Sequence, residues 1–433
     1  MTQTPAKVQA MQSINLHRVV VTGMGAVTPI GNTVKEYEEG LFSGRNGIAP
    51  ITQFDTSEHS VKLAAEVRNL DFDAFVEPRM QKRMDRYTML AMIASAEALE
   101  DSNLLGNGDP DRDRIGVIIG SGIGGIGTFE EQYVRMQKRG PRHVSPLFVP
   151  MMISDIATGY VSIEHGLKGP NFSIVSACAT ASHSIGEAYR NIQVGSADAM
   201  VAGGAEAPVT PASVAGFTSM KAMTRNPDPE TACRPFDAGR DGFIMAEGSG
   251  ILVLESLEYA QRRGANILGE LVGYGATGDA YHITAPAEGG EGAVRAMKLA
   301  INGAGIAPED VGYVNAHGTS TLFNDKNEST AIKTVFGEHA HNGLIVSSTK
   351  SMTGHLMGAS GGVEAIASLL ALKRQEIPPT IHYRESDPEC DLNYSPNEPT
   401  LHTFDYAVSN TFGFGGHNSS LVVGAFRDNG AGG

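Results

Sequence analysis

The sequence has few cysteines. Only three occur among its 433 residues. They are Cys178, Cys233 and Cys390, and no two of them form a C-x-x-C pair. An odd number without paired spacing argues against a disulfide framework. Residues 1–17 are polar and lack the apolar core of a secretory signal. We therefore expect a reduced protein that works in the cytoplasm, with residues 1–17 as a tail.

Charge is also scarce, and its balance is acidic. Charged residues make up 19% of the chain, against a typical share of ~25%. The 33 basic and 48 acidic residues give a net charge of −15. This balance argues against a nucleic-acid binder that depends on phosphate contacts. The hydrophobic share of 41% is too high for a disordered chain.

A long hydrophobic run is missing as well. The longest apolar helical stretch, residues 356–372, contains Glu364 and glycines at 358, 361 and 362. We therefore expect no transmembrane helix and no membrane partner. Glycine is abundant instead, with 52 residues, but it lacks the three-residue period of collagen. This surplus predicts a densely packed body with many tight turns.

Short runs rich in Val and Ile alternate with helical stretches, a pattern typical of α/β proteins with largely parallel sheets. Strands are predicted at 18–22, 115–120, 172–177, 199–203 and 251–255, and again at 268–275, 312–316, 344–349, 407–410 and 420–424. Helices are predicted at 83–103, 179–194, 291–303, 325–336 and 361–374. The elements follow the same order in both halves, which predicts two related α/β units in one body.

Three motif-like patterns are interpreted as structural or as chance matches. Residues 120–125 match G-x-G-x-x-G, but no acidic residue closes a following strand. Residues 358–362 match G-x-S-x-G without an acid and a histidine in the order of a hydrolase. Residues 347–350 match S-x-x-K, but the accompanying S-D-N and K-T-G elements are absent. No metal is expected, because no H-E-x-x-H or Cys/His ligand spacing occurs.

Cys178 is a candidate nucleophile. It follows a predicted apolar strand and comes directly before a predicted helix. The free N–H groups and partial positive charge at a helix N-terminus stabilise a thiolate. We therefore expect the pKa of Cys178 to lie below the free value of ~8.5. The alternative is a buried structural cysteine, and we interpret Cys233 and Cys390, which lie in loop-like stretches, in that way.

Two histidines, His317 and His355, each follow a predicted strand. Together with Cys178 they suggest thioester acyl transfer followed by carbanion formation, because neutral imidazoles can donate hydrogen bonds to an enolate oxygen. Phe and Gly alternate within residues 410–418. We expect this segment to expose a backbone N–H that pairs with that of Cys178 as an oxyanion hole. The alternative is a tight turn with two core aromatic rings.

Four motifs in this order resemble those of the β-ketoacyl-[acyl-carrier-protein] synthases. They are Ser-Ala-Cys178-Ala-Thr, Asn-Ala-His317-Gly-Thr-Ser-Thr, Ser-Thr-Lys350-Ser-Met-Thr-Gly-His355 and Asn-Thr-Phe-Gly-Phe-Gly-Gly. The similarity runs from residue 18 to residue 426 and points to elongating members of dissociated fatty-acid synthesis. It implies an α/β, thiolase-like five-layer αβαβα fold that works as a homodimer. Its two βαβαβαββ-type halves would be residues 18–266 and 267–427, with tails at 1–17 and 428–433.

The resemblance also implies the reaction and its residues. Acyl and malonyl groups, both carried on acyl carrier protein, would undergo decarboxylative Claisen condensation, with no metal or cofactor beyond the carrier's phosphopantetheine. Cys178 would accept the acyl group, His317 and His355 would promote decarboxylation and condensation, and Lys350 with Glu364 would support them. The backbone N–H groups of Cys178 and Phe414 would form the oxyanion hole. The remaining contacts to substrate would come from Thr319 and Thr321 at the phosphopantetheine arm and from Phe412, Phe414 and Ile123 at the acyl pocket.

An acidic chain that binds an acidic carrier protein needs a local basic patch. The resemblance implies such a patch at Arg79, Lys82 and Arg83, with Arg142 and Lys221 as further candidates. Taken alone, the run of basic residues is typical of a solvated helix face. Residues 322–324, Leu-Phe-Asn, are bulkier than expected for the family and leave the shape of the pocket entrance open.

Other functions also fit parts of the sequence. A specialised polyketide-type ketosynthase would differ only in its acyl preference. A non-catalytic chain-length partner subunit is disfavoured, because Cys178 and both histidines are present. A thiolase would have a second cysteine near the C-terminal Gly-Phe-Gly-Gly stretch, and none is there. A cysteine hydrolase would need a base and an orienting acid rather than two histidines with a lysine.

Overall fold

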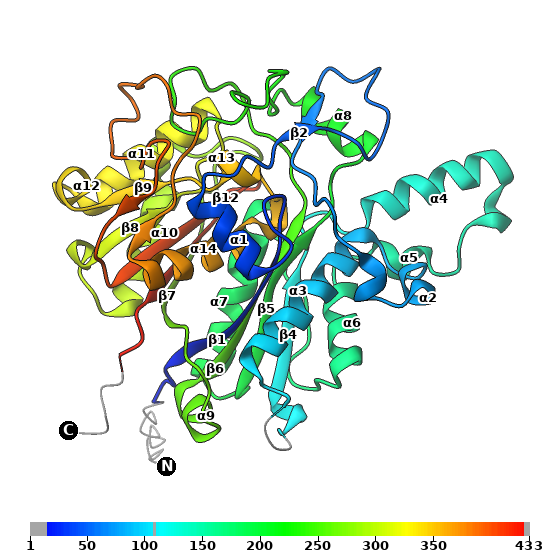
Figure 1. The fold of residues 1–433 in the computed structure, drawn as a ribbon, viewed down its shortest axis with the longest axis horizontal. Coiled ribbons are helices and arrows are strands. Elements are labelled where there is room, and N and C mark those ends of the chain that lie inside the picture. The colour runs from blue at the N-terminus through cyan, green and yellow to red at the C-terminus, as the bar shows by residue number, and fades with distance from the viewer. Residues whose placement is uncertain (1–14, 107–109, 428–433) are drawn as a thin grey trace, which may run out of the picture.

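The computed structural model describes residues 15–106 and 110–427. Residues 1–14 of the proposed tail 1–17, and the whole proposed tail 428–433, lie outside the described residues. The Val- and Ile-rich runs form a nine-stranded mixed sheet in the order β4-β5-β6-β1-β7-β13-β12-β8-β9 (Figure 1). The strands of its first half are β1 (Val19–Val27), β4 (Ile115–Gly120), β5 (Ala199–Glu206) and β6 (Gly248–Ser256). Those of its second half are β7 (Gly269–Gly278), β8 (Val311–Asn315), β9 (Ile345–Ser347), β12 (Tyr406–Gly413) and β13 (His417–Gly424).

The two halves of the sheet repeat one topology. The order β1-β6-β5-β4 in the first half matches β7-β13-β12-β8 in the second. In the first half, β1 with β6 and β6 with β5 pair antiparallel, and β5 with β4 pairs parallel. In the second half, β7 with β13 and β13 with β12 pair antiparallel, and β12 with β8 pairs parallel. A short antiparallel contact, Val19–Val21 against Gly269–Leu271, joins β1 to β7. The repeated α/β halves predicted from the order of elements are therefore confirmed, whereas the boundary at 266/267 stays a prediction.

One predicted strand is absent. Residues 172–177 form no strand, and only Asn171 makes a bridge, a single parallel one to Val117 of β4. The equivalent position in the second half is filled by β9. Phe172 and Val175 are exposed, so the segment lies at a free edge where no other described segment pairs with its outer side. The prediction of a strand over 172–177 was wrong for this reason.

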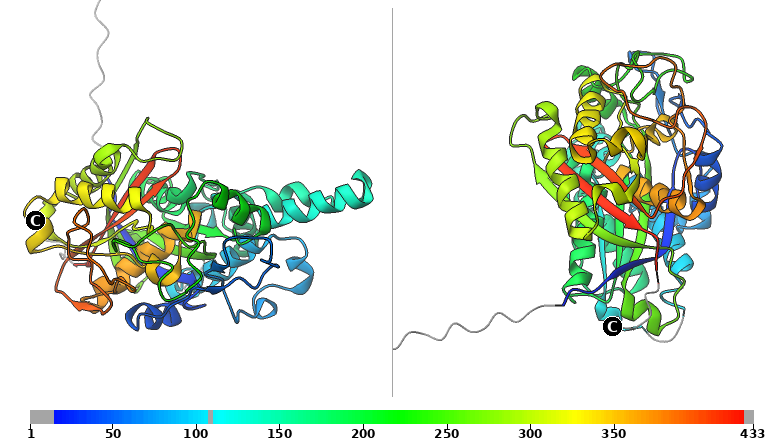
Figure 2. Two further views of the ribbon diagram at one scale, coloured as in Figure 1. Left: turned by 90° about the horizontal axis from the view of Figure 1, so that it is seen from above. Right: turned by 90° about the vertical axis from the view of Figure 1, so that its left-hand side faces the viewer.

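Helices cover both faces of the sheet and fill the space between its halves (Figures 1 and 2). The helices α7 (Thr180–Gln193) and α14 (Ser360–Arg374) lie in the middle, since each contacts strands of both halves. On the outer faces, α3 (Arg86–Ser102) and α6 (Ile156–His165) pack on the first half, and α10 (Glu291–Ala304) with α11 (Leu322–Phe336) pack on the second. The result is the expected αβαβα arrangement of five layers.

Shorter elements complete the fold. The hairpins β2 (Ala49–Pro50) with β3 (Leu63–Ala64) and β10 (Glu376–Ile377) with β11 (Thr400–Leu401) lie outside the main sheet. The remaining helices are α1 (Val34–Phe42), α2 (Pro78–Gln81), α4 (Ile126–Arg139), α5 (Phe148–Met152), α8 (Pro211–Ser219), α9 (Leu257–Arg262), α12 (His339–Asn342) and α13 (Lys350–Thr353). Of these, α4 projects away from the body (Figures 1 and 2). No helix in residues 15–106 and 110–427 is long and apolar enough to cross a membrane.

The start of α3 differs from the predicted helix 83–103. The side chain of Asp85 accepts a hydrogen bond from the Tyr87 N–H and caps the helix, which therefore begins at Arg86. Residues 78–81 form the separate short helix α2. This break places Lys82 and Arg83 in the connection between two helices rather than on one continuous helix face.

The middle layer depends on close contact between α14 and β6. All residues of α14 from Ser360 to Leu372 are buried. A Cβ atom built on Gly250 of β6 would lie 2.3 Å from the backbone nitrogen of Val363. Small residues in both elements therefore let the helix backbone approach the strand backbone, which explains part of the glycine surplus.

We predict that Gly250→Ala destabilises the protein by about 1–3 kcal/mol, because the added methyl group forces α14 away from the sheet. Gly303→Ala is the matched control. Gly303 is exposed in α10 with no atom near its Cβ position, so alanine there should be neutral or stabilise by up to ~1 kcal/mol. Urea unfolding of both variants measures the difference, and equal midpoints would contradict the prediction.

Candidate active site

Cys178 lies in a tight turn before the first central helix. The turn, Ala177–Ala179, is a single 3₁₀ turn that leads directly into α7. Ala177 has a φ of 51°, a left-handed conformation that costs a non-glycine residue roughly 1–2 kcal/mol. A Cβ atom on Gly413, at the end of β12, would lie 3.1 Å from the Cys178 nitrogen. The end of β12 thus packs directly on the backbone of the turn that carries Cys178.

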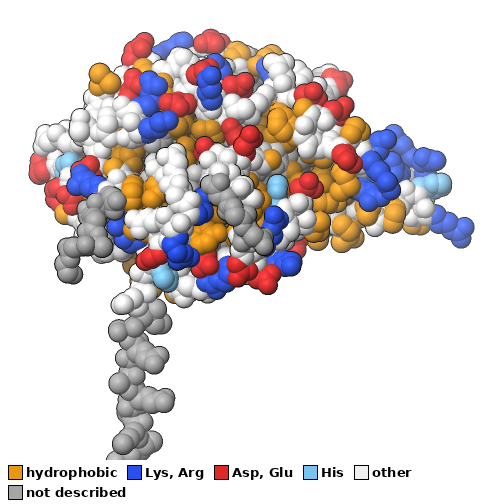
Figure 3. Space-filling model, turned by 60° about the horizontal axis from the view of Figure 1, so that its bottom comes forward, with side chains coloured by type: hydrophobic (Ala, Val, Ile, Leu, Met, Phe, Trp, Pro, Cys, Tyr) orange, Lys and Arg blue, Asp and Glu red, His pale blue; other side chains and the backbone are white. Residues whose placement is uncertain are grey.

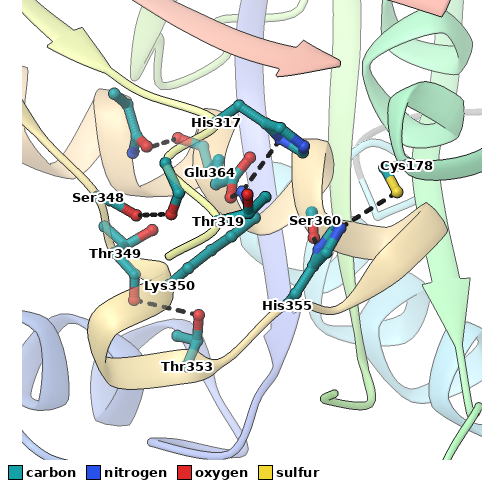
Figure 4. A network of polar contacts seen from close by, with 12 residues as sticks. Cys178, His317, Thr319, Ser348, Thr349, Lys350, Thr353, His355, Ser360 and Glu364 are labelled. Atoms are coloured by element: carbon teal, nitrogen blue, oxygen red, sulfur yellow. Dashed lines mark hydrogen bonds and ion pairs between the residues drawn. The ribbon is translucent and has the colours of Figure 1, made fainter. Parts of the chain in front are cut away.

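His355 faces the sulfur of Cys178. Its Nε2 lies 3.1 Å from Sγ (Figure 4). Its Nδ1 accepts a hydrogen bond from the backbone N–H of Met357 at 3.3 Å and lies 2.9 Å from the Oγ of Ser360. Because Nδ1 accepts this N–H, the proton of the neutral ring is on Nε2. The ring therefore presents an N–H to the space beside Cys178.

His317 completes the group from a neighbouring strand end. Its ring centroid lies 5.3 Å from that of His355. The Nζ of Lys350 donates to Nδ1 of His317 at 3.4 Å, which leaves the proton of this neutral ring on Nε2 as well. The carboxylate of Glu328 accepts the backbone N–H groups of His317 and Gly318, both at 2.8 Å. The two rings are held by different elements and both offer an Nε2–H group.

The charges behind the histidines are buried. Lys350 and Glu364 form an ion pair, and their side chains are only 1% and 2% exposed. Burial lowers the pKa of His317 and of His355 well below the usual value, and the positive charge of Lys350 lowers both further. Burial raises the pKa of Glu364, whereas Lys350 opposes this shift. Both imidazoles are therefore neutral at pH 7.

The resting nucleophile is a thiol. Burial raises the pKa of Cys178 to about 12, while the charge of Lys350 and a hydrogen bond from the backbone N–H of Phe414 lower it. The prediction of a pKa below the free value was wrong, because the loss of hydration destabilises the thiolate more than Lys350 and the Phe414 N–H stabilise it. The contact with Phe414 nevertheless places the backbone N–H of Phe414 beside the Cys178 side chain, as a second donor besides the backbone N–H of Cys178 itself.

A pocket of 730 Å³ opens from Cys178, His317 and His355 to the surface. The ring of Phe412 packs edge-on against His317 with centroids 5.7 Å apart, and Phe414 stacks on Phe217 at 6.3 Å. The hydroxyl oxygens of Thr319 and Thr321 lie 2.8 Å apart on the pocket wall. Leu322 and Phe323 also line the pocket and are exposed, so the bulky segment noted in the sequence forms part of the rim.

Ile123 lies apart from this pocket. It lines a separate depression together with Ile126, Phe129 and Met152, beside α4 and α5. The other residues expected to bind or support substrate lie at the main pocket. Its wall includes Phe412, Phe414, Thr319 and Thr321. The pair Lys350 and Glu364 lies behind the histidines. The described chain does not bring Ile123 into contact with that group.

The predicted basic patch is spread over three places. Arg79, Lys82 and Arg83 are exposed around α2, whereas the neighbouring Arg86 pairs with Glu247 at 2.7 Å. Lys221 is exposed at the pocket rim. Arg142 follows the end of the projecting helix α4, where Figure 3 shows Lys and Arg side chains gathered. The structure therefore separates Arg142 from the residues around α2.

Two buried carboxylates were missed by the sequence analysis. Glu206, at the carboxyl end of β5, accepts hydrogen bonds from the side chain of Ser121 at 2.6 Å and from the N–H groups of Gly122, Ile123 and Gly358 at 2.7, 3.1 and 2.9 Å. Its position in the sequence, as an acidic residue at the end of an apolar strand, could have marked Glu206 as a candidate. Glu328, which holds His317, lies within a helix and had no such signal. Burial raises its pKa to about 7.

No cluster of three or more His, Cys, Asp or Glu side chains that could hold a metal occurs within residues 15–106 and 110–427. The chemistry available to these residues is that of a thiol, two neutral imidazole donors and backbone N–H groups in one pocket. This combination suits acyl transfer to sulfur and stabilisation of a developing oxyanion.

Family models match most of the chain. The model for the N-terminal domain of β-ketoacyl synthases matches residues 16–260. The model for their C-terminal domain matches residues 268–384. The chain belongs to the β-ketoacyl synthase family. Its pocket residues Cys178, His317 and His355 lie within the matched segments.

Individual β-ketoacyl synthases are similar over almost their full length. A 3-oxoacyl-[acyl-carrier-protein] synthase 2 of Staphylococcus aureus is 57% identical over 410 residues, which cover 95% of this chain and 99% of the relative. One from Synechocystis is 52% identical over 413 residues, with the same two coverages. The crystal structure of a β-ketoacyl synthase from Burkholderia phymatum is 37% identical, with a TM-score of 0.89 over 95% of this chain and 100% of that one.

A ketosynthase of a type II polyketide synthase, solved in complex with its acyl-carrier protein, is also similar. It is 34% identical with a TM-score of 0.87, over 95% of this chain and 100% of that chain. The fold of this chain is therefore similar both to a polyketide ketosynthase and to a β-ketoacyl synthase. The fold alone does not distinguish them.

We predict that Glu364→Gln lowers the free energy of unfolding by about 3–5 kcal/mol, because it leaves the buried ammonium group of Lys350 without its counter-charge. The double variant Lys350→Met/Glu364→Gln removes both charges and should recover most of this loss. Urea unfolding of the two variants and the wild type provides the measurement. A single variant as stable as the wild type would contradict the proposed role of the pair.

Proposed function

We propose that the chain is a 3-oxoacyl-[acyl-carrier-protein] synthase of the elongating type, which condenses an acyl group with a malonyl group, both held on acyl carrier protein. One observation carries the proposal. The Cys178 sulfur lies 3.1 Å from Nε2 of His355, and His317 faces the same pocket with a second Nε2–H. This arrangement provides a nucleophile for the first half-reaction and two neutral hydrogen-bond donors for the second, at one point.

In the first half-reaction, the sulfur of Cys178 attacks the carbonyl carbon of the acyl thioester. The N–H groups of Cys178 and Phe414 hold the oxyanion of the tetrahedral intermediate. The carbon–sulfur bond to the carrier's phosphopantetheine breaks, and the departing thiolate takes the proton that Cys178 has lost. The acyl group remains on Cys178, and the free carrier leaves along the pocket past Thr319 and Thr321.

In the second half-reaction, malonyl carrier protein enters the same pocket. Its carboxylate leaves as CO₂, and the Nε2–H groups of His317 and His355 stabilise the enolate oxygen that forms. The enolate carbon attacks the thioester of Cys178, and the new carbon–carbon bond forms as the carbon–sulfur bond breaks. The departing Cys178 thiolate takes up one proton from solvent water, which balances the negative charge that the malonyl carboxylate brought in. Lys350 assists by keeping both rings neutral, because its charge opposes their protonation.

We also propose that two copies of the chain form the working enzyme and that it acts in the cytoplasm. The dimer is supported by apolar side chains on the projecting helix α4. Phe129, Tyr133 and Val134 are 42%, 50% and 47% exposed, and a second copy would cover them. Ile123 lies in the depression beside this helix, which fits an acyl pocket that is completed at the contact between copies.

A polyketide-type ketosynthase remains the second candidate, because such an enzyme shares the fold at a TM-score of 0.87. The chain's 57% identity to a 3-oxoacyl synthase 2 favours fatty-acid elongation. Condensation assays with malonyl carrier protein and acyl carrier proteins from C4 to C16 test this directly. Turnover across the saturated chains supports elongation, whereas failure with all of them would overturn it.

We predict that Cys178→Ala forms no acyl-enzyme, because the attacking sulfur is gone. The wild type should gain the mass of one acyl group after incubation with acyl carrier protein, as measured by intact-protein mass spectrometry. Cys233→Ala is the matched control, since the Cys233 sulfur donates to the Lys350 carbonyl outside the pocket. Acylation that persists in Cys178→Ala would refute the assignment of the nucleophile.

We predict that Lys82→Glu/Arg83→Glu raises the KM for carrier-protein substrates by roughly tenfold at low salt, because reversed charges repel an acidic partner. The difference should shrink at high salt, where exposed charges are screened. The control Lys35→Glu/Lys298→Glu makes the same change in net charge on α1 and α10, which do not line the pocket. If both double variants change the KM equally, net charge rather than a docking patch is responsible.

A further inference from the structure

A third buried histidine lies beside the active site and takes no part in the steps above. His183 is in the first turns of α7 and is 9% exposed. Its Nδ1 lies 2.6 Å from the Oγ of Ser176, and its Nε2 lies 3.4 Å from the backbone oxygen of Asn418. Both ring nitrogens of this buried histidine therefore have a polar partner, as buried polar atoms require.

The two contacts define the protonation state of the ring. A carbonyl oxygen only accepts, so Nε2 carries the proton and donates to Asn418. Nδ1 of the neutral ring then accepts the hydroxyl proton of Ser176. Burial lowers the pKa of His183 to about 4, so the ring stays neutral at the pH at which the enzyme works. The bridge Ser176–His183–Asn418 therefore keeps one fixed set of donors and acceptors.

Each end of the bridge lies next to one donor of the oxyanion hole. Ser176 is two residues before Cys178, on the near side of the strained Ala177. Asn418 pairs with Phe412 across β12 and β13, so it faces the strand that leads into Phe414. The Asn418 side chain also donates to Asp279 at 2.6 Å, which fixes the far side of this hairpin.

We infer that His183 is a positioning residue that sets the spacing between the two backbone N–H donors of the oxyanion hole. This inference rests on the proposed function, because it gives those donors a role in acylation. One donor is on the Cys178 turn and the other is on the β12–β13 hairpin, and the bridge of His183 spans the two. The packing of Gly413 against the Cys178 nitrogen keeps them close, and the bridge resists their sliding past one another.

The inference predicts an unequal effect on the two half-reactions. Acylation of Cys178 depends on the oxyanion hole, and a displacement of about 1 Å can cost roughly 10²-fold in rate. Decarboxylation of the malonyl group depends on His317 and His355, which are held by Lys350, Glu328 and Met357 rather than by His183. His183→Phe keeps an aromatic ring of similar shape against Tyr274 but removes both hydrogen bonds.

The experiment measures both half-reactions in the full-length protein. Acylation is followed by mass spectrometry, and CO₂ release from malonyl carrier protein is measured in a Cys178→Ala background. We expect His183→Phe to slow acylation by roughly tenfold to 10²-fold and to change decarboxylation less than about twofold. His183→Gln, whose amide supplies one donor and one acceptor, should restore part of the acylation rate.

Ser176→Ala provides an independent variant that breaks the bridge at its other end and leaves the ring in place. It should also slow acylation selectively, and the double variant Ser176→Ala/His183→Phe should be no slower than the slower single variant, because both belong to one unit. Equal losses in acylation and decarboxylation, or additive losses in the double variant, would overturn the inference alone. A wild type that fails to acylate Cys178 would overturn the proposed function as well.

Discussion

The buried ion pair of Lys350 with Glu364 places a positive charge directly behind the pocket. The ammonium group of Lys350 pairs with Glu364 on the central helix α14 and donates to His317. Its charge lowers the pKa of both histidines and opposes the burial that raises the pKa of Cys178. Burial and this charge together keep the imidazoles neutral, so that both can meet an enolate as donors of defined geometry. The rest of the site is arranged around this condition.

The repeated halves explain how the nucleophile and the histidines meet. Each central helix begins after a 3₁₀ turn that contains a left-handed, non-glycine residue: Ala177 before α7 and Met357 before α14. Glu206 accepts N–H groups from Gly122 in the first half and from Gly358 in the second, and so ties the segment after β4 to the turn before α14. One half therefore supplies the sulfur and the other supplies the imidazoles, where the two halves of the sheet face each other.

Much of the fold followed from local patterns. Runs of Val and Ile located every strand of the main sheet, because strands buried on both faces must be apolar throughout. The pattern failed at residues 172–177, which remain at an exposed edge and form no strand, while only the neighbouring Asn171 makes a bridge. An apolar run indicates that a segment can form a strand, but the strand forms only where another strand lies beside it to accept and donate hydrogen bonds. The start of α3 was displaced for a local reason, since the side chain of Asp85 caps the helix two residues before Tyr87.

The sequence by itself determined which side chains carry the chemistry. Cys178, His317, His355 and the Phe-Gly segment stand at strand ends, and strand ends in such sheets converge. Only the tertiary structure decided their states. Burial, which no local pattern records, makes Cys178 a resting thiol and keeps three histidines neutral. It also places Glu206, Glu328 and His183 beside residues that are far from them along the chain, because the fold brings distant segments into contact and removes the water that would otherwise weaken their interactions.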